Sequence, residues 1–305
     1  MKEITKELLR QISGHDGVFT GAYNLREDGC CAGRQSSAHI KIESKTDQPG
    51  LEIRVAPGTL GETVSIPACV THGDVDDLVY NDFYIGENAD ITIVAGCGVH
   101  TDTGEPARHN GIHRFILEKG AKVKYIEKHI GTGKGAGLRS IDPVTEVILG
   151  ENAVLEMDTA QIGGVDRTTR KTNATLQAGA RLFIRERILT EADQQAFTEF
   201  HVELNGNGAG VDLISRSVAR EHSHQAYHSV IVGNAPCTGH SECDAILADS
   251  GTVDAAPELR AHDNDAILIH EAAIGKIAGE QIMKLRTLGL TEEEAEATII
   301  SGFLS

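Results

Sequence analysis

The chain has 305 residues, of which 33 are glycine and 4% are aromatic, with no tryptophan and a formal net charge of −17. This length is sufficient for a large core, in one long domain or two small ones. The acidic balance excludes a nucleic-acid partner, because phosphate binding needs a basic surface. Many glycines and few large rings favour repetitive β structure with tight turns.

The N-terminal residues carry charge throughout and lack the apolar segment of a secretory signal peptide. No apolar run approaches the length of a membrane span, so a membrane is not an expected partner. Six cysteines in so long a chain do not indicate a disulfide framework. We therefore expect a cytoplasmic protein whose thiols are free to bind metal or sulfur.

Residues 1–36 are predicted to form an N-terminal helical segment. Ile4, Leu8, Leu9 and Ile12 recur at helical spacing, and Gly14 follows as a stop. This pattern is typical of a short amphipathic helix that docks onto the main body of the protein.

Residues 37–275 are predicted to form a β-solenoid core. A turn with a polar residue, then Asn or Gly, then Ala, recurs before β-rich strands, and its alanines Ala89, Ala121, Ala153 and Ala180 are 32, 32 and 27 residues apart. A period in this range indicates a solenoid, and the strand content makes it a β-helix. Asn and Gly suit the left-handed backbone of such turns.

Residues 276–305 are predicted to form a helical region that closes the solenoid and could bind a partner. Thr291 and Glu294 form a capping box that opens a second helix. The first helix should end at Gly289. Its apolar face would consist of Ile274, Ile277, Ile282, Leu285 and Leu288.

A thiol, an imidazole and a carboxylate recur about one repeat apart near the end of the core. Residues one coil apart in a β-helix lie on neighbouring strands about 5 Å apart, and Cys243 precedes His270 by 27 positions and Glu271 by 28. We interpret these three residues as a candidate metal site. Only one of His270 and Glu271 can share the face of Cys243, because adjacent strand residues point in opposite directions. The alternative is a buried cysteine beneath a solvated His–Glu pair.

A second set of residues has similar spacing. Cys69 and Cys97 are 28 positions apart, and His129 follows Cys97 by 32, which predicts a stacked ladder able to hold or relay sulfur. The alternative is that each cysteine fills space in the coil interior. Adjacent Cys30 and Cys31 point in different directions in an extended segment and make a poor joint metal site.

Two further motifs are candidate ligand sites, one for a metal ion and one for a phosphate group. His222 and His224 would face one side of a strand and could bind one metal, although polar strand-face histidines are the alternative. The segment GTGKGAG at 131–137 departs from the Walker phosphate loop, because Lys134 is followed by Gly rather than Ser or Thr. We therefore do not expect the chain to bind its own ATP.

These motifs resemble the SufB/SufD scaffold proteins of iron–sulfur cluster assembly, and SufB in particular. The resemblance runs through SRSVAREHSHQAY (215–227), SECDAIL (241–247), PELRAHDNDAILIHEAAIGKI (257–277) and LGLTEEEAEATIISGF (288–303), and more weakly back to about residue 65. It implies a right-handed parallel β-helix with a helical C-terminal region. It also implies dimerisation through the last coils and binding of the ABC-type ATPase SufC through the C-terminal helices.

The resemblance also implies roles for individual residues. Cys243 matches the SufB cysteine held essential for cluster assembly, and Glu271 matches a glutamate at the dimer interface. His270 aligns with the histidine that SufD offers at that interface, and His222 falls on a histidine of the SufB pattern HSQNSY. The chain is shorter than typical SufB and lacks its long N-terminal region. The second SufB cysteine has no convincing match, so Cys97 and Cys69 are candidates by stacking alone.

The expected function is that of a scaffold rather than an enzyme. A transient iron–sulfur cluster would form at the seam of a homodimer, where Cys237 could add a thiol to Cys243. A SufC-like partner would hydrolyse ATP, a cysteine desulfurase or other source would supply sulfur, and apo-proteins would receive the cluster. The main alternative is a SufD-like structural partner of the ATPase without its own cluster. A polysaccharide-acting β-helix enzyme is disfavoured by the scarcity of aromatic residues.

Overall fold

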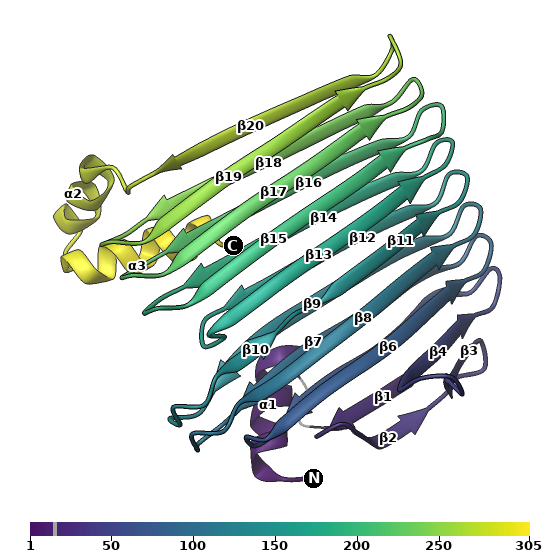
Figure 1. Ribbon diagram of the computed structural model, residues 1–305, viewed down its shortest axis with the longest axis horizontal. Coiled ribbons are helices and arrows are strands. Elements are labelled where there is room, and N and C mark those ends of the chain that lie inside the picture. Colours follow the sequence, from purple (N-terminus) through teal and green to yellow (C-terminus); the bar gives the residue numbers. More distant parts are fainter. Residues whose placement is uncertain (15–16) are drawn as a thin grey trace.

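The computed structural model describes residues 1–14 and 17–305. It shows a mainly β protein, a solenoid of about 8 turns with a short N-terminal helix and C-terminal helices. Successive coils stack into a rod, with strands from neighbouring coils side by side (Figure 1). The predicted fold class is confirmed.

Each coil contributes strands to two sheets. The first sheet contains β1 (Ala22–Glu27), β2 (Cys30–Gln35), β5 (Leu60–Val70), β7 (Asp90–His100), β9 (Lys122–Thr132), β12 (Val154–Ile162), β14 (Arg181–Thr190), β16 (Gly210–Ala219), β18 (Thr238–Leu247) and β20 (Ile267–Gly275). The second contains β3 (Ile40–Ser44), β4 (Gly50–Val55), β6 (Val75–Ile85), β8 (Ala107–Leu117), β10 (Arg139–Ile141), β11 (Val144–Leu149), β13 (Arg167–Leu176), β15 (Gln195–Leu204), β17 (His224–Gly233) and β19 (Thr252–Ala261). The helices are α1 (Glu3–Ser13), α2 (Gly279–Thr287) and α3 (Glu292–Phe303).

The recurring turns set the coil period. Their four alanines are fully buried, and each follows a residue with left-handed backbone. Those left-handed residues are Asn88, Gly120, Asn152 and Gly179, with φ between 56° and 67°. Asn and Gly tolerate this conformation at little steric cost. Along the strands, inward side chains alternate with outward ones, so the core lies between the two sheets.

The segment 1–36 is helical only over α1, which corrects the predicted helical segment. Strands β1 and β2 form an antiparallel hairpin around Asp28 and Gly29, whose φ values are 47° and 78°. An Asp-Gly pair is a strong hairpin signal, because positive φ at both residues suits a tight hairpin turn, and Asp28-Gly29 is the sequence signal for this hairpin. Together with the antiparallel pair β3–β4, the hairpin covers the N-terminal end of the solenoid.

Helix α1 docks on the outer face of the first sheet, as its apolar spacing predicts. Leu8 and Leu9 are fully buried and pack in one cluster with Cys69 and Ile130. The helix comes this close because glycines lie beneath it: a Cβ added at Gly98 would stand 3.0 Å from Leu8 Cδ2.

The C-terminal region contains two helices, but the first starts later than predicted. Ile274 belongs to β20, which pairs with β18 as far as Gly275, so α2 begins only at Gly279. The capping box of Thr291 and Glu294 is confirmed at the start of α3. The division into segments 1–36, 37–275 and 276–305 remains a prediction.

The helical pair does not close the end of the solenoid. Ile300 of helix α3 and Leu304 just after the helix pack against Val218 on the outer face of the first sheet. Strands β19 and β20 are the last strands of their sheets, and within residues 1–14 and 17–305 no strand pairs with their far edges (Figure 1). In that same part of the chain, no helix has the length and apolar character needed to cross a membrane.

Substituting Gly98 by valine should displace α1. The new side chain would collide with Leu8, and overpacking of this kind costs about 1–3 kcal/mol. Urea unfolding of the variant should show this loss, and trypsin should cleave sooner after Arg10. A valine at Gly104, where an added Cβ meets nothing within 4 Å, is the matched control. Equal stability of both variants would contradict the proposed packing.

Candidate functional site

The strand register decides which of the predicted ligands meet. Cys243 lies opposite Ala272, whereas His270 lies opposite Ser241 and Glu271 opposite Glu242. The predicted one-coil contact of Cys243 with His270 or Glu271 is therefore wrong in register. The reason is the turn 262–266, which has five residues where the preceding turn, 234–237, has four. The last coil is one residue longer than the coil before it.

His270 and Glu271 nevertheless point to opposite faces of the sheet, as expected, and only His270 shares the face of Cys243. Ser241 and Cys243 are buried on the inner face of β18, and His270 shares that face on β20. His270 Nδ1 lies 3.1 Å from the Ser241 carbonyl oxygen. Because a carbonyl only accepts, Nδ1 carries the proton and Nε2 keeps its lone pair for a ligand. Glu271 points to the outer face.

Cys243 is almost completely buried, with 1% of its surface exposed. Burial raises the pKa of its thiol to about 12, with smaller contributions from the charges of Glu186 and Asp244. The thiol is therefore protonated at neutral pH. A thiolate, which is the metal-binding and nucleophilic form, requires that iron or another electrophile displace the proton.

Cys237 does not share a site with Cys243 within one chain. It occupies the position of the turn alanines in its own coil, one residue before β18, and is buried there. Six residues of extended strand span about 20 Å. That separation exceeds the reach of two thiols to one metal ion.

A column of polar side chains crosses the interior and ends at Cys243. Glu127, Thr159, Glu186 and Ser215 are successive register partners, and Ser215 lies opposite Cys243. All of these residues are buried. Ser215 Oγ donates a hydrogen bond of 3.1 Å to Glu186 Oε2. The column gave no sequence signal, because its members are spaced by 27 to 32 positions in a chain whose period varies.

Arg170 from the second sheet joins the acidic members of this column. Its guanidinium contacts Glu127 Oε2 at 2.9 Å and Glu186 Oε1 at 3.1 Å, and it donates to His129 Nδ1 at 3.1 Å. Burial alone would raise the pKa of Glu127, but His129 and Arg170 outweigh it and hold that pKa well below its usual range. Buried charges of this kind persist only when they are paired.

The predicted sulfur ladder is present only in part. Cys97 lies directly opposite His129 on the inner face, beside the column that leads to Cys243. Cys69 lies opposite Gly98 instead and packs beneath α1 on the outer face. Burial raises the pKa of Cys97 well above its usual range and that of Cys69 to about 12.

The remaining candidates lie apart from these groups. His222 is exposed in the turn before β17, whereas His224 stands on the outer face of β17 and contacts Thr252 Oγ1 at 2.9 Å through Nδ1. The two therefore do not form the predicted strand-face pair. Cys30 and Cys31 are exposed on β2.

Two residues that the sequence reasoning overlooked lie beside Glu271. His240 and Glu242 are on the outer face of β18, and His240 Nε2 is 3.4 Å from Glu271 Oε2. The alternation in HSECD placed His240 and Glu242 on one face, opposite to Cys243. This alternation is the sequence signal that could have found the pair.

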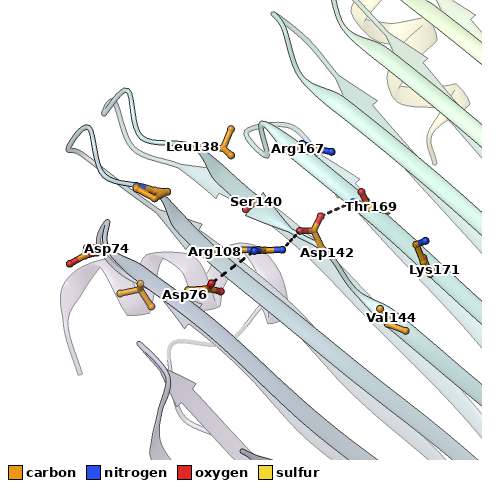
Figure 2. A pocket seen from close by; sticks show the side chains of 12 residues that line it. Asp74, Asp76, Arg108, Leu138, Ser140, Asp142, Val144, Arg167, Thr169 and Lys171 are labelled. Atoms are coloured by element: carbon orange, nitrogen blue, oxygen red, sulfur yellow. Dashed lines mark hydrogen bonds and ion pairs between the residues drawn. The ribbon is translucent and has the colours of Figure 1, made fainter.

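A groove of about 700 Å³ lies far from Cys243, on the outer face of the second sheet. It forms where the strand is interrupted between β10 and β11, at Asp142 and Pro143. Figure 2 shows Arg108 between Asp76 and Asp142, at 3.9 and 3.0 Å. The groove lining has three carboxylates and three cationic side chains, so it has no evident charge preference for a ligand: Asp74, Asp76, Asp142, Arg108, Arg167 and Lys171.

Comparison with known proteins identifies the relatives of the chain. Residues 81–303 match the family model described as "SUF system FeS cluster assembly, SufBD core domain". An iron-sulfur cluster assembly SufBD family protein of Methanothermobacter thermautotrophicus is 30% identical over 268 residues, which cover 86% of this chain and 64% of that protein. An iron-sulfur cluster assembly SufBD family protein of Archaeoglobus fulgidus is 29% identical over 267 residues, which cover 87% of this chain and 70% of that protein. The chain thus spans about two thirds of the length of these relatives.

Replacing Arg170 by methionine should destabilise the protein strongly. The substitution leaves Glu127 and Glu186 buried without their cation, which typically costs about 3–5 kcal/mol. Replacing the neighbouring Lys171 by methionine is the matched control, because its pair with Glu199 is half exposed and should contribute at most about 1 kcal/mol. Urea unfolding measures both. A similar small loss in both variants would show that the buried network carries no net stabilisation.

The six thiols should differ in reactivity. In the folded protein, iodoacetamide should modify the exposed Cys30 and Cys31 first and the four buried cysteines slowly. For Cys243, with a pKa of about 12, the rate should rise about tenfold per pH unit through the alkaline range, because only the thiolate reacts. Peptide mass spectrometry at several pH values measures this. Rapid modification of Cys243 at neutral pH would refute the burial of this thiol.

Proposed function

Because this chain belongs to the SufBD family of iron–sulfur cluster assembly proteins, we propose that it is a scaffold on which iron and sulfide assemble into a nascent cluster. The observation that carries the proposal is the placement of Cys243 and His270 on one inner face, on the last two strands of the first sheet. The cluster is cargo that passes on to apo-proteins.

The donor set suits temporary binding. Thiolate is the usual ligand of iron–sulfur clusters, and Cys243 supplies it once iron displaces its proton. His270 Nε2 adds a nitrogen donor. Nitrogen and oxygen donors hold iron more loosely than thiolate, which favours release of the finished cluster.

The free end of the solenoid supports a homodimer. Strands β19 and β20 present unpaired edges, and such edges invite pairing with another chain. Ile267 and Ile269 on β20 are 61% and 50% exposed, so apolar area is available for a second copy. A two-fold pairing of these edges brings both copies of His270 and Glu271 to one seam, with Cys243 one strand behind it on β18.

The C-terminal helices provide a surface for a SufC-like ATPase. No residue of α2 is buried. Met283 in this helix and Leu288 just after it are 68% and 73% exposed. Helix α3 is anchored on Val218 of β16. Ile246 of β18 packs in the same cluster, and α2 follows β20 directly along the chain, so a pull on α2 by the partner reaches the strands that carry the candidate ligands.

The polar interior supports sulfur delivery from a cysteine desulfurase or another source. Cys97 and His129 stand at one end of the buried column, and Cys243 stands at the other. Between these ends, the side chains of Arg170 and Ser215 provide hydrogen-bond donors along the column. Cys69 and His222 lie off this column, so we assign them no part in it.

The second candidate function is that of a SufD-like structural partner of the ATPase without its own cluster. The observation that favours it is the burial of Cys243 as a protonated thiol. This protein would form a stable complex with the ATPase and would not take up iron.

Anaerobic reconstitution with iron and sulfide distinguishes the two. The scaffold should develop the visible absorbance of a cluster, and Cys243→Ser should lose most of it, while Cys30→Ser, which changes an exposed thiol, should retain it. Sedimentation of the same samples measures whether the loaded protein is a dimer. Undiminished absorbance in Cys243→Ser would disprove the ligand assignment, and no absorbance in the unsubstituted protein would favour the structural partner.

A further inference from the structure

We propose that His240, Glu242 and Glu271 form a site for a first-row divalent cation on the outer face of the first sheet. The site contains no sulfur and is separate from Cys243, which points to the opposite face of the same strands. That the natural ion is iron(II) rests on the proposed function; the existence of the site does not.

The strand geometry brings three donors together. His240 and Glu242 are two residues apart on β18 and therefore point to the same side. Glu271 of β20 is the register partner of Glu242. One donor atom from each of the three lies within 4.8 Å of the others. Two ligands of one ion at about 2.0–2.2 Å are at most about 4.4 Å apart, so a small side-chain rotation brings all three donors to one ion.

Asp212 orients the imidazole for this purpose. It is the register partner of His240 on β16, and its Oδ1 lies 2.7 Å from His240 Nδ1. A carboxylate accepts the Nδ1 proton, so Nε2 is the atom that faces Glu271. A histidine ligand whose second nitrogen donates to a carboxylate is the usual arrangement around protein-bound metals.

The distribution of charge also calls for a cation. Glu242 and Glu271 are directly opposite on neighbouring strands, where like charges destabilise a sheet. Asp244 adds a further carboxylate two residues beyond Glu242, on the same face. A bound divalent ion would turn this repulsion into attraction.

Other histidine–carboxylate pairs on the surface lack this arrangement. His224 lies 3.8 Å from Asp254, and His201 lies 3.6 Å from Glu203, with one carboxylate each. Among the residues that the structure describes, only His240, Glu242 and Glu271 place three such donors together. One imidazole and two carboxylates, with positions left for water, suit iron(II), manganese(II) or zinc(II).

Cobalt(II) titration of the purified full chain tests the site, because cobalt reports its ligands by absorption. The protein should bind one cobalt ion with d–d bands and without the sulfur-to-metal charge-transfer band of a thiolate ligand. His240→Ala and Glu242→Gln should each weaken binding at least about tenfold, and Asp212→Asn about 10–100-fold through loss of orientation. His224→Ala, which changes another outer-face histidine, and Cys243→Ser should bind as the unsubstituted protein does. Circular dichroism confirms that each variant is folded.

The outcomes separate this inference from the proposed function. If His240→Ala and Glu242→Gln bind cobalt as tightly as the unsubstituted protein, the site does not exist, and His240 serves only as an ion-pair partner of Asp212 and Glu271. A thiolate band that disappears in Cys243→Ser would also overturn it, by placing the ion on the inner face. Cobalt bound as expected in a protein that never assembles a cluster would leave this site standing and reject the scaffold function.

Discussion

The register between successive coils is the constraint on which the rest of this structure depends. Parallel strands hold each side chain directly beside its counterpart one coil earlier, so the number of residues per coil decides which groups meet. Left-handed turn residues such as Asn88 and Asn152 set where each coil turns, and the number of residues per coil varies between 27 and 32. A single additional residue in the turn 262–266 then sets His270 inward and Glu271 outward. One strand pair thereby offers different ligands on its two faces.

The same constraint explains the polar interior. Apolar columns would stabilise the solenoid more simply, since replacing a buried ion pair by packed apolar groups is often neutral or favourable. Instead, Arg170 ties Glu127 to Glu186 in mid-core, and the column continues to Cys243. A polar path that ends at the candidate ligand gives this costly arrangement a use, in the transfer of sulfur that we propose.

Local, periodic signals predict the structure correctly, as in the turn alanines, the apolar face of α1 and the capping box of α3. Contacts that depend on the exact number of residues per coil are not predictable in this way. A spacing of 27 or 28 positions predicts one coil, but the coil from Cys243 to Ala272 has 29. The buried network around Arg170 could not be foreseen, because its members come from different coils and both sheets. His240 and Glu242 could have been found from their alternation.

The helices near the two ends of the chain, α1 and α3, cover the same row of outward-facing side chains on the first sheet. Helix α1 covers Cys69 and Ile130 near one end, and α3 covers Val218 near the other. Between them Ile162 remains 38% exposed. Any further polypeptide joined to either end of this chain would emerge on that flank of the rod. The opposite sheet and the terminal edges would stay clear of it, so the molecule could carry additional domains without obstructing the dimer seam that we propose.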